Sequence, residues 1–323
     1  MICNVLQNML PMPKFRVLFI AFAGIALCSA VLWFATRPPR DPVCKGVKLS
    51  EWIAKANRDS SENRLTPEDL RGLGPEAVEF LEHSIRSHVP GETKGLGERL
   101  PNALRKYLPE SLYRRDSYGS HEQCLFALEQ LSNLGPEAQA AIPLLVELLD
   151  HSNNSLRDAA AYGLNRIGPA SWDEIERTLG HTASKGRRSI LFTLTSRLSS
   201  PAPDPTQAEV ERILEIFLDA CADPDPEIKL LGVGGLLNCQ GFYSYHFGGL
   251  DLPGRAGPVV ASCLNRGEGI LKVVSARALY YYPESIHLAV PELELMEGDS
   301  SSFYSDPARA TLQVYQKTHG HPE

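Results

Sequence analysis

One eight-residue pattern returns along this chain and limits what the chain can fold into. Residues 70–77, Leu-Arg-Gly-Leu-Gly-Pro-Glu-Ala, match residues 131–138 at six of eight positions, and a third copy starts 33 residues later at Leu164. In each copy the glycine accepts the left-handed backbone that ends a helix, and the proline begins the next helix without an N–H donor. Such recurring helix ends predict a stack of paired helices. Gly257-Pro258 is a fourth, more weakly embedded Gly-Pro step.

The residues between two copies have helical periodicity. From 140 to 149 the apolar side chains recur at i, i+1, i+4, i+5 and i+8, on one face of a helix. Residues 156–167 form a second apolar stripe, with small residues where two helices would approach closely. The intervening residues 150–155 are polar and offer an asparagine or serine as N-cap. The unit is therefore helix, turn, helix and Gly-Pro, with Leu145 and Leu164 on facing stripes.

Weaker copies continue toward the C-terminal end. Residues 187–194 repeat the spacing of residues 157–164 thirty positions on, and residues 222–229 repeat the inter-helix turn. Further helix pairs are expected at 258–264 with 271–281 and at 286–296 with 307–315. Period-2 alternation is almost absent, so no strand is predicted. Residues 89–120 depart from the pattern, because glycines and prolines interrupt it, and predict a spacer or an irregular helix.

The best-preserved unit, residues 131–169, resembles a bacterial HEAT or HEAT-like repeat. Its Gly-Pro opening, its Leu-Leu helix end and the Ser-Leu-Arg-x-Ala-Ala start of its second helix carry the resemblance. Residues 47–52 also resemble the lead-in helix of anchored bacterial repeat proteins. The resemblance implies an all-α fold, an α-α superhelix of the HEAT-like or armadillo type, and usually protein binding, with no catalytic residues to carry over. In such a solenoid each pair contacts only its neighbours, which leaves an extended, curved surface.

Residues 17–35 form an apolar run unlike the rest of the chain. The run has nineteen residues, and Ser29 is its only clearly polar side chain. With the two residues before it, a helix here would span about 31 Å, close to the hydrocarbon thickness of a bilayer. A cleaved signal peptide is the alternative, but its apolar stretch usually has only about 7–15 residues. The length and the basic and proline flanks favour an uncleaved transmembrane helix.

The orientation of this helix has two opposing indications. Two basic residues precede the run and four follow it closely, which by the positive-inside rule favours a cytoplasmic C-terminal domain. A short basic N-terminus followed directly by one span has the order of a signal-anchor, which exports the domain. We expect a single-pass membrane protein with its repeat domain on the exported, periplasmic side. The expected organisation is a basic tail (1–16), a signal-anchor (17–35), a linker (36–48), a HEAT-like domain (49–318) and a tail (319–323).

Charge and cysteine content exclude two classes of partner and site. The formal net charge of −7 argues against nucleic acid, since polyanion binders need a basic surface. Short basic pairs at 105–106, 114–115 and 187–188 are interpreted as solvated helix faces. The seven cysteines are scattered without a C-x-x-C pair, so neither a disulfide framework nor a zinc site is predicted. Buried apolar cysteines on helix faces are expected instead.

No motif for catalysis or cofactor binding is complete. His121-Glu122 lacks the second histidine of a zinc-protease helix, and residues 232–237 lack the last glycine of a dinucleotide loop. His319-Gly320-His321 lies in a terminal tail. We therefore predict no catalytic, cofactor-binding or metal-binding residues, and no enzyme.

One aromatic segment is a candidate for partner binding. Residues 240–257 read as an over-long connection, and long loops in such stacks are often functional. Its candidate contact residues are Phe242, Tyr243, Tyr245, His246 and Phe247. The alternative is that these rings fold back and cover the core. Of the three tyrosines 280–282, at least one should be buried, because consecutive helix positions face different directions.

These observations predict a membrane-tethered scaffold that binds a protein or peptide on the concave face of the stack. A HEAT-like enzyme or lyase-type member is one alternative. A purely structural spacer in the cell envelope is the other.

Overall fold

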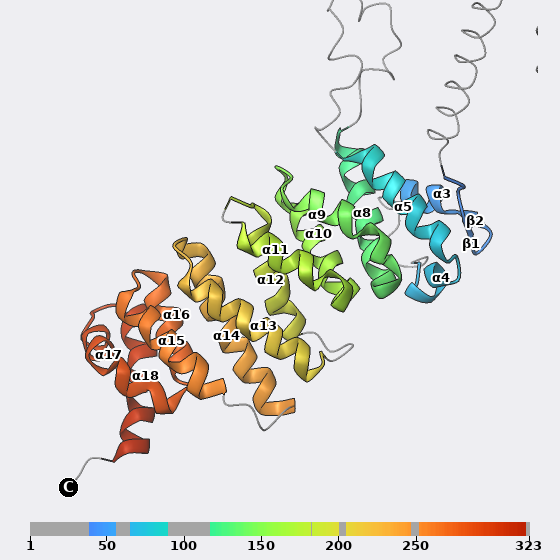
Figure 1. The fold of residues 1–323 in the computed structure, drawn as a ribbon. Coiled ribbons are helices and arrows are strands. Elements are labelled where there is room, and N and C mark those ends of the chain that lie inside the picture. Colours follow the sequence, from blue (N-terminus) through green and yellow to red (C-terminus); the bar gives the residue numbers. More distant parts are fainter. Residues whose placement is uncertain are drawn as a thin grey trace, which may run out of the picture.

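The computed structural model describes residues 39–55, 65–89, 117–181, 183–199, 205–246 and 252–320. Within these ranges the chain is a stack of helices preceded by a small β-hairpin (Figure 1). The elements are β1 (Val43–Cys44), β2 (Val47–Lys48), α3 (Leu49–Lys55), α4 (Pro67–Arg71), α5 (Pro75–His88), α8 (Ser117–Leu134), η2 (Gly135–Ala141), α9 (Ile142–Leu149), α10 (Asn154–Ile167), η3 (Gly168–Ser171), α11 (Trp172–Gly180), α12 (Gly186–Ser199), α13 (Gln207–Ala222), α14 (Pro226–His246), α15 (Leu252–Arg266), α16 (Ile270–Leu279), η4 (Pro283–Leu288), α17 (Val290–Glu297) and α18 (Ser302–His319).

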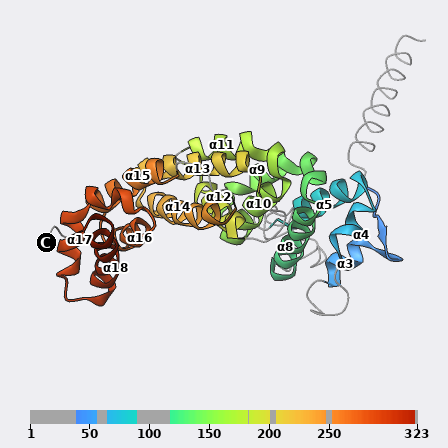
Figure 2. The same cartoon turned by 90° about the horizontal axis from the view of Figure 1, so that it is seen from below.

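The helices form two layers of a curved solenoid. Successive helices pair as α5 with α8, α9 with α10, α11 with α12, α13 with α14, α15 with α16 and α17 with α18. In Figure 2 the helices α9, α11, α13 and α15 follow the outside of an arc, and α10, α12 and α14 lie beneath them on the hollow side. We call these the outer and inner layers. The expected all-α repeat solenoid is therefore confirmed in the described residues.

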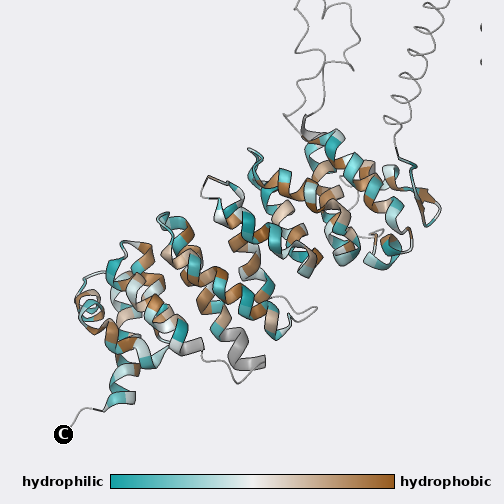
Figure 3. Cartoon of the chain, viewed as in Figure 1, coloured by the Kyte–Doolittle hydropathy of each residue, from teal (hydrophilic) through white to brown (hydrophobic). Residues whose placement is uncertain are grey.

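The inner helices pack side by side from one end of the stack to the other. Each of α8, α10, α12, α14, α16 and α18 contacts the next in this order. Apolar and polar residues alternate along the helices (Figure 3), as in amphipathic helices that bury one face. The buried side chains form one continuous core that extends from Cys44 to Leu312. Leu145 and Leu164, predicted on facing stripes, are both fully buried.

The repeated Gly-Pro steps have the predicted backbone. Gly74, Gly135 and Gly168 all adopt positive φ, at 66°, 63° and 78°, so each glycine turns the chain at the end of a helix. Asn153 caps α10 as expected, because its side-chain oxygen accepts a hydrogen bond of 2.8 Å from the N–H of Ser155. The structure differs from the prediction after the second and third Gly-Pro steps, because a 3-10 turn, η2 or η3, precedes the next α-helix there.

Two sequence-based helix boundaries were wrong. Gly257-Pro258 is not a helix junction: α15 begins at Leu252 and contains Pro258. Pro307 likewise lies inside α18 rather than at its start. A proline in the first turn of a helix leaves no intrahelical hydrogen bond unmade, and these two lie only five or six positions from the helix start, where the loss is one bond.

The absence of strands was also a wrong expectation. Val43 and Cys44 pair antiparallel with Lys48 and Val47, and Lys45 at the turn has a φ of 51°. Residues 47 and 48 are thus strand, and the lead-in helix begins at Leu49. Strands of two residues carry no period-2 signal, which is why the pattern missed them. The hairpin contacts α4 through an ion pair of 2.6 Å between Lys45 and Asp69, which holds the pKa of Asp69 at about 2.

In the basic pair at 187–188, one arginine is exposed to solvent and the other is buried. Arg188 is exposed and pairs with Glu227 at 2.9 Å, as a solvated helix face would. Arg187 is instead buried in an ion pair with Asp223, with 7% and 11% of the two side chains exposed. The pair joins the start of α12 to the α13–α14 turn, a contact between repeats that the local sequence did not reveal. The other two basic pairs lie outside the described residues.

The predicted membrane span cannot be located in the described part of the chain. Residues 17–35 lie outside it, as do residues 90–116 of the expected spacer. Among the helices that are described, none combines the length and the apolar character needed to cross a bilayer.

Candidate functional site

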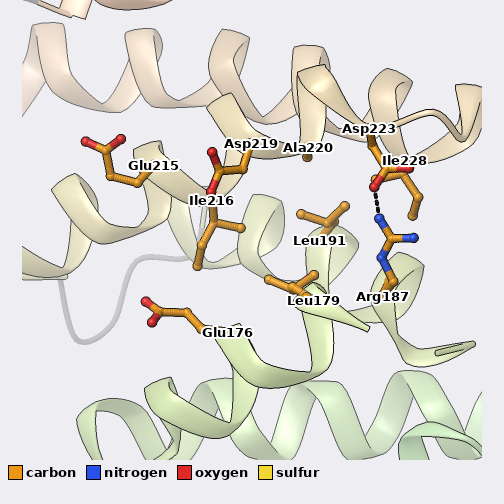
Figure 4. A pocket seen from close by; sticks show the side chains of 11 residues that line it. Glu176, Leu179, Arg187, Leu191, Glu215, Ile216, Asp219, Ala220, Asp223 and Ile228 are labelled. Carbon is orange, nitrogen blue, oxygen red and sulfur yellow. Dashed lines mark hydrogen bonds and ion pairs between the residues drawn. The ribbon is translucent and has the colours of Figure 1, made fainter. Parts of the chain in front are cut away.

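A cleft opens between the outer helices α11 and α13 (Figure 4). Arg212 in the second turn of α13 pairs with Asp173 in the first turn of α11 at 2.8 Å and joins the two helices. A cavity of about 420 Å³ lies between the end of α11 and the second half of α13. Its floor is aliphatic and consists of Leu179, Leu191, Ile216 and Ile228.

Carboxylates surround the mouth of this cleft. Three of them have cationic partners: Glu176 pairs with Arg212, Glu215 with Arg255, and Asp223 with Arg187. The hydrogen bond to Glu176 raises the pKa of Arg212 above its ordinary value. The fourth, Asp219, is exposed, and its carboxylate has no ion pair or hydrogen bond within the described ranges.

The chemistry of the cleft suits a long cationic side chain. Lysine and arginine bury an aliphatic stem against apolar surface while the charged end stays among polar groups. Here the stem would lie on the leucine and isoleucine floor, and the ammonium or guanidinium would reach Asp219. The lining consists of carboxylates, one guanidinium and aliphatic groups.

A second hollow of about 520 Å³ lies beside the turn that follows α11. Its lining includes Asp150, whose carboxylate accepts hydrogen bonds from the hydroxyl of Ser184 at 2.9 Å and the N–H of Lys185 at 3.2 Å. These bonds tie the turn before α12 to the end of α9. Asp150 therefore holds the stack together rather than awaiting a ligand.

Among the described residues of the inner helices α10 and α12, two aromatic rings are exposed. Tyr162 on α10 is 43% exposed and Phe192 on α12 is 58% exposed. They occupy the same repeat position, since both lie two residues before the leucine, Leu164 or Leu194, that is fully buried in each helix. We call these two residues the inner-face aromatic pair.

Two hydrogen bonds show that the rings lie at the same level of their helices. Ser189 donates to Asp158 at 2.6 Å, and the side-chain amide of Asn165 donates to the carbonyl of Thr193 at 3.3 Å. Position 162 lies between 158 and 165 on α10, and position 192 lies between 189 and 193 on α12. The pair therefore sits across the seam between two adjacent inner helices.

Polar groups border the inner-face aromatic pair. One turn before the rings lie Asp158, bonded to Ser189, and Arg188, paired with Glu227. One turn after Phe192 lies the exposed Ser196. An apolar centre with a polar border is the usual anatomy of a protein-binding surface.

The structure changes the context of the predicted contact residues. Residues 240–246 are not a loop but the last turns of α14, and residues 252–257 belong to α15. Phe242, Tyr243, Tyr245 and His246 thus lie on a helix, while Phe247 and all five side chains lie outside what the structure describes. Their role in binding stays a prediction.

One of the three tyrosines 280–282 is buried, as predicted. Tyr282 is fully buried, and its hydroxyl donates to the carbonyl of Leu236 at 2.7 Å. Burial raises the pKa of Tyr282 well above its ordinary value. Tyr280 and Tyr281 are about half exposed.

Sequence reasoning missed the inner-face aromatic pair, although a signal for it existed. The thirty-residue offset that aligns 157–164 with 187–194 also aligns Tyr162 with Phe192. Exposure is what marks the two rings, and it depends on which helix face the neighbours leave uncovered. No group of three or more potential metal ligands occurs in the described ranges.

Comparison with known proteins gives structural similarity only. No protein-family model matches the chain, and no curated protein matches it. An engineered protein known from a crystal structure is 17% identical and covers 61% of this chain and 91% of its own, with a TM-score of 0.41. A designed armadillo repeat protein in complex with the peptide (KR)4 is 14% identical, covering 62% and 94%, with a TM-score of 0.43. Another designed armadillo repeat protein is 12% identical, covering 73% and 99%, with a TM-score of 0.42.

Proposed function

We propose that this chain is a non-enzymatic scaffold of the bacterial HEAT-like kind that its sequence resembles. Residues 17–35 tether it to a membrane, and its inner face holds a protein or peptide partner. The observation that supports this most is the inner-face aromatic pair, with Tyr162 and Phe192 exposed at the same position of adjacent inner helices. Aromatic rings supply large contact area at low cost in conformational entropy, which suits them to anchor a partner.

The curvature of the stack indicates what kind of partner fits. The pair lies on the layer that faces the hollow of the arc (Figure 2). A second copy of the chain, docked with its own concave face, would touch this concave face only at the two ends of the stack. A flat bilayer would do the same, and both would leave the rings uncovered. A slender segment fits instead. We therefore commit to a single helix or extended peptide of a partner protein that lays an apolar side chain between Tyr162 and Phe192.

The membrane tether and the exported location rest on the sequence. The apolar run of residues 17–35 supports the tether, and the order of a short basic tail and one span supports export. The inner-face aromatic pair favours a binding role over a purely structural spacer, because a spacer has no use for two exposed rings in register.

Site-specific photo-crosslinking in intact cells tests the proposal. A benzophenone amino acid replaces Tyr162 or Phe192 in the full-length chain, and the same replacement at Leu295 is the matched control. Leu295 is 72% exposed but lies on α17, away from the inner-face pair. We expect one crosslinked partner at both inner positions and none at position 295.

The crosslinked partner is then purified and its affinity is measured. Replacing Tyr162 and Phe192 together by serine should raise Kd at least about tenfold, which corresponds to about 1.4 kcal/mol, while Leu295→Ser leaves Kd unchanged. Both rings are largely exposed, so the midpoint of thermal unfolding should barely move. Equal crosslinking at all three positions, or a crosslink to a second copy of the chain, would overturn the assigned surface.

A further inference from the structure

Two cysteines from distant parts of the chain meet between the outer helices α13 and α15. The thiol of Cys263 on α15 lies 3.8 Å from the carbonyl oxygen of Cys221 on α13, across 42 positions of sequence. The two side chains also interact, because each thiol shifts the pKa of the other. Both residues are buried, with 5% and 6% exposed.

The other described cysteines have different surroundings. The thiol of Cys124 lies 4.0 Å from the carbonyl of Ile85, and that of Cys44 lies 3.8 Å from the carbonyl of Asp69. Burial raises the pKa of Cys124 and of Cys239 to about 12, which keeps both thiols protonated and unreactive. Cys239 is fully buried on α14.

Cys263 differs from these in the direction of its pKa shift, which is downward. The hydrogen bond from the Cys221 thiol lowers the pKa of Cys263, and the nearby Lys229 lowers it further against the opposing effect of burial. The pKa of Cys221 is raised, first by the same hydrogen bond. A thiol whose pKa is lowered thus lies beside a second thiol, which is the arrangement that starts thiol–disulfide exchange.

We propose that Cys221 and Cys263 are a disulfide-forming pair that crosslinks α13 to α15 when the chain meets a disulfide oxidant. The Cys263 thiolate attacks one sulfur of the oxidant's disulfide and releases the other as a thiolate. Cys221 then loses its proton and attacks the mixed disulfide at the Cys263 sulfur. The oxidant leaves as two thiols that hold both electrons and both protons, and one S–S bond remains in the chain.

A crosslink at this place would close a loop that contains all of α14. Closing such a loop lowers the entropy of the unfolded chain and so stabilises the folded one. The inference rests on the proposed function in one respect only, which is that an exported domain meets the oxidant in the cell. Disulfides persist in exported proteins and not in the cytosol.

The test uses the full-length chain, reduced and then incubated with oxidised glutathione. After denaturation and alkylation, we expect two fewer alkylated cysteines and a proteolytic fragment that joins residue 221 to residue 263. Cys221→Ala or Cys263→Ala should abolish that loss, whereas the matched control Cys239→Ala should retain it. The midpoint of thermal unfolding should be higher in the oxidised than in the reduced wild type.

Unchanged alkylation after oxidation, or a fragment that joins other cysteines, would overturn the inference, and the peptide map of the wild type decides this even if a variant fails to fold. A second measurement distinguishes a failure of the disulfide pairing from a failure of the proposed exported location. When intact cells are quenched with acid and their free thiols are alkylated, Cys221 and Cys263 should be found in a disulfide if the domain is exported. A pair that oxidises in the tube but is reduced in cells would refute export and leave the pairing itself standing.

Discussion

Replacing Gly235 by alanine tests how closely α13 and α14 approach. A Cβ at this position would lie 2.3 Å from Cδ1 and Cε1 of Phe217, far inside the roughly 3.5–4.0 Å of a normal carbon contact. Phe217 is fully buried, so there is no free space into which its ring could move. The two helices must therefore move apart by more than about 1 Å, or the ring must leave its rotamer.

The expected cost follows from two opposing effects. Overpacking a well-packed core costs about 1–3 kcal/mol, while alanine in place of glycine inside a helix contributes about 0.5–1 kcal/mol. We expect Gly235→Ala to lower the free energy of unfolding by about 1–2 kcal/mol. The adjacent Gly234 is the matched control, because nothing lies within 4 Å of its Cβ position. Gly234→Ala should raise the free energy of unfolding by about 0.5–1 kcal/mol.

Native-state hydrogen exchange of the full-length chain measures both variants. The amides of α13 and α14 report the local free energy of opening, which suits a solenoid whose stability is a sum over neighbouring pairs. The two variants should differ by about 2 kcal/mol, with the loss at position 235 centred on α13 and α14. A Gly235→Ala chain as stable as the Gly234→Ala chain would mean that the close packing of the helices on Phe217 is wrong.

Three further predictions concern the core, the ion pairs and the tether. Leu145→Ala or Leu164→Ala should each cost about 2–5 kcal/mol in chemical denaturation, because both side chains are fully buried; losses below about 0.5 kcal/mol at both would contradict this. Arg187→Ala leaves Asp223 without its buried cation and should cost about 3–5 kcal/mol, whereas Arg188→Ala, at an exposed pair, should change stability by less than about 1 kcal/mol; equal effects would refute the burial difference. If residues 17–35 are an uncleaved anchor, the chain stays in the membrane pellet through alkaline wash and keeps its first residue. A mature chain that begins after residue 28 would show a cleaved signal peptide instead.

The candidate site was less predictable from sequence than the fold. Residues 240–257 contain glycines and aromatic rings, which favour a connection, yet α14 extends to His246 and α15 begins at Leu252. Glycine weakens a helix by only about 1 kcal/mol, and a helix packed against neighbours tolerates that. The inner-face aromatic pair was overlooked because the helical period was used only to find the buried stripe, and neither Tyr162 nor Phe192 belongs to that stripe. Only the packing of α10 and α12 shows that Tyr162 and Phe192 are left outside.

Sequence by itself determined the features that depend on a few neighbouring residues. The turns at Gly74, Gly135 and Gly168, the cap at Asn153 and the buried stripe of Leu164 all follow from local backbone preference and helical period. These suffice for an all-α repeat solenoid, since each pair needs only its neighbours to bury its apolar face.

Tertiary structure decided what depends on residues far apart in the chain. The burial of Arg187 against Asp223 and the meeting of Cys221 with Cys263 join different repeats. Their partners lie 36 and 42 positions away, and no local pattern records such distances. The same holds for the α11–α13 cleft, whose lining comes from α11, α12, α13 and α14. Which side chains meet between repeats depends on how closely the helices pack, and that closeness is set by the side chains of both helices together.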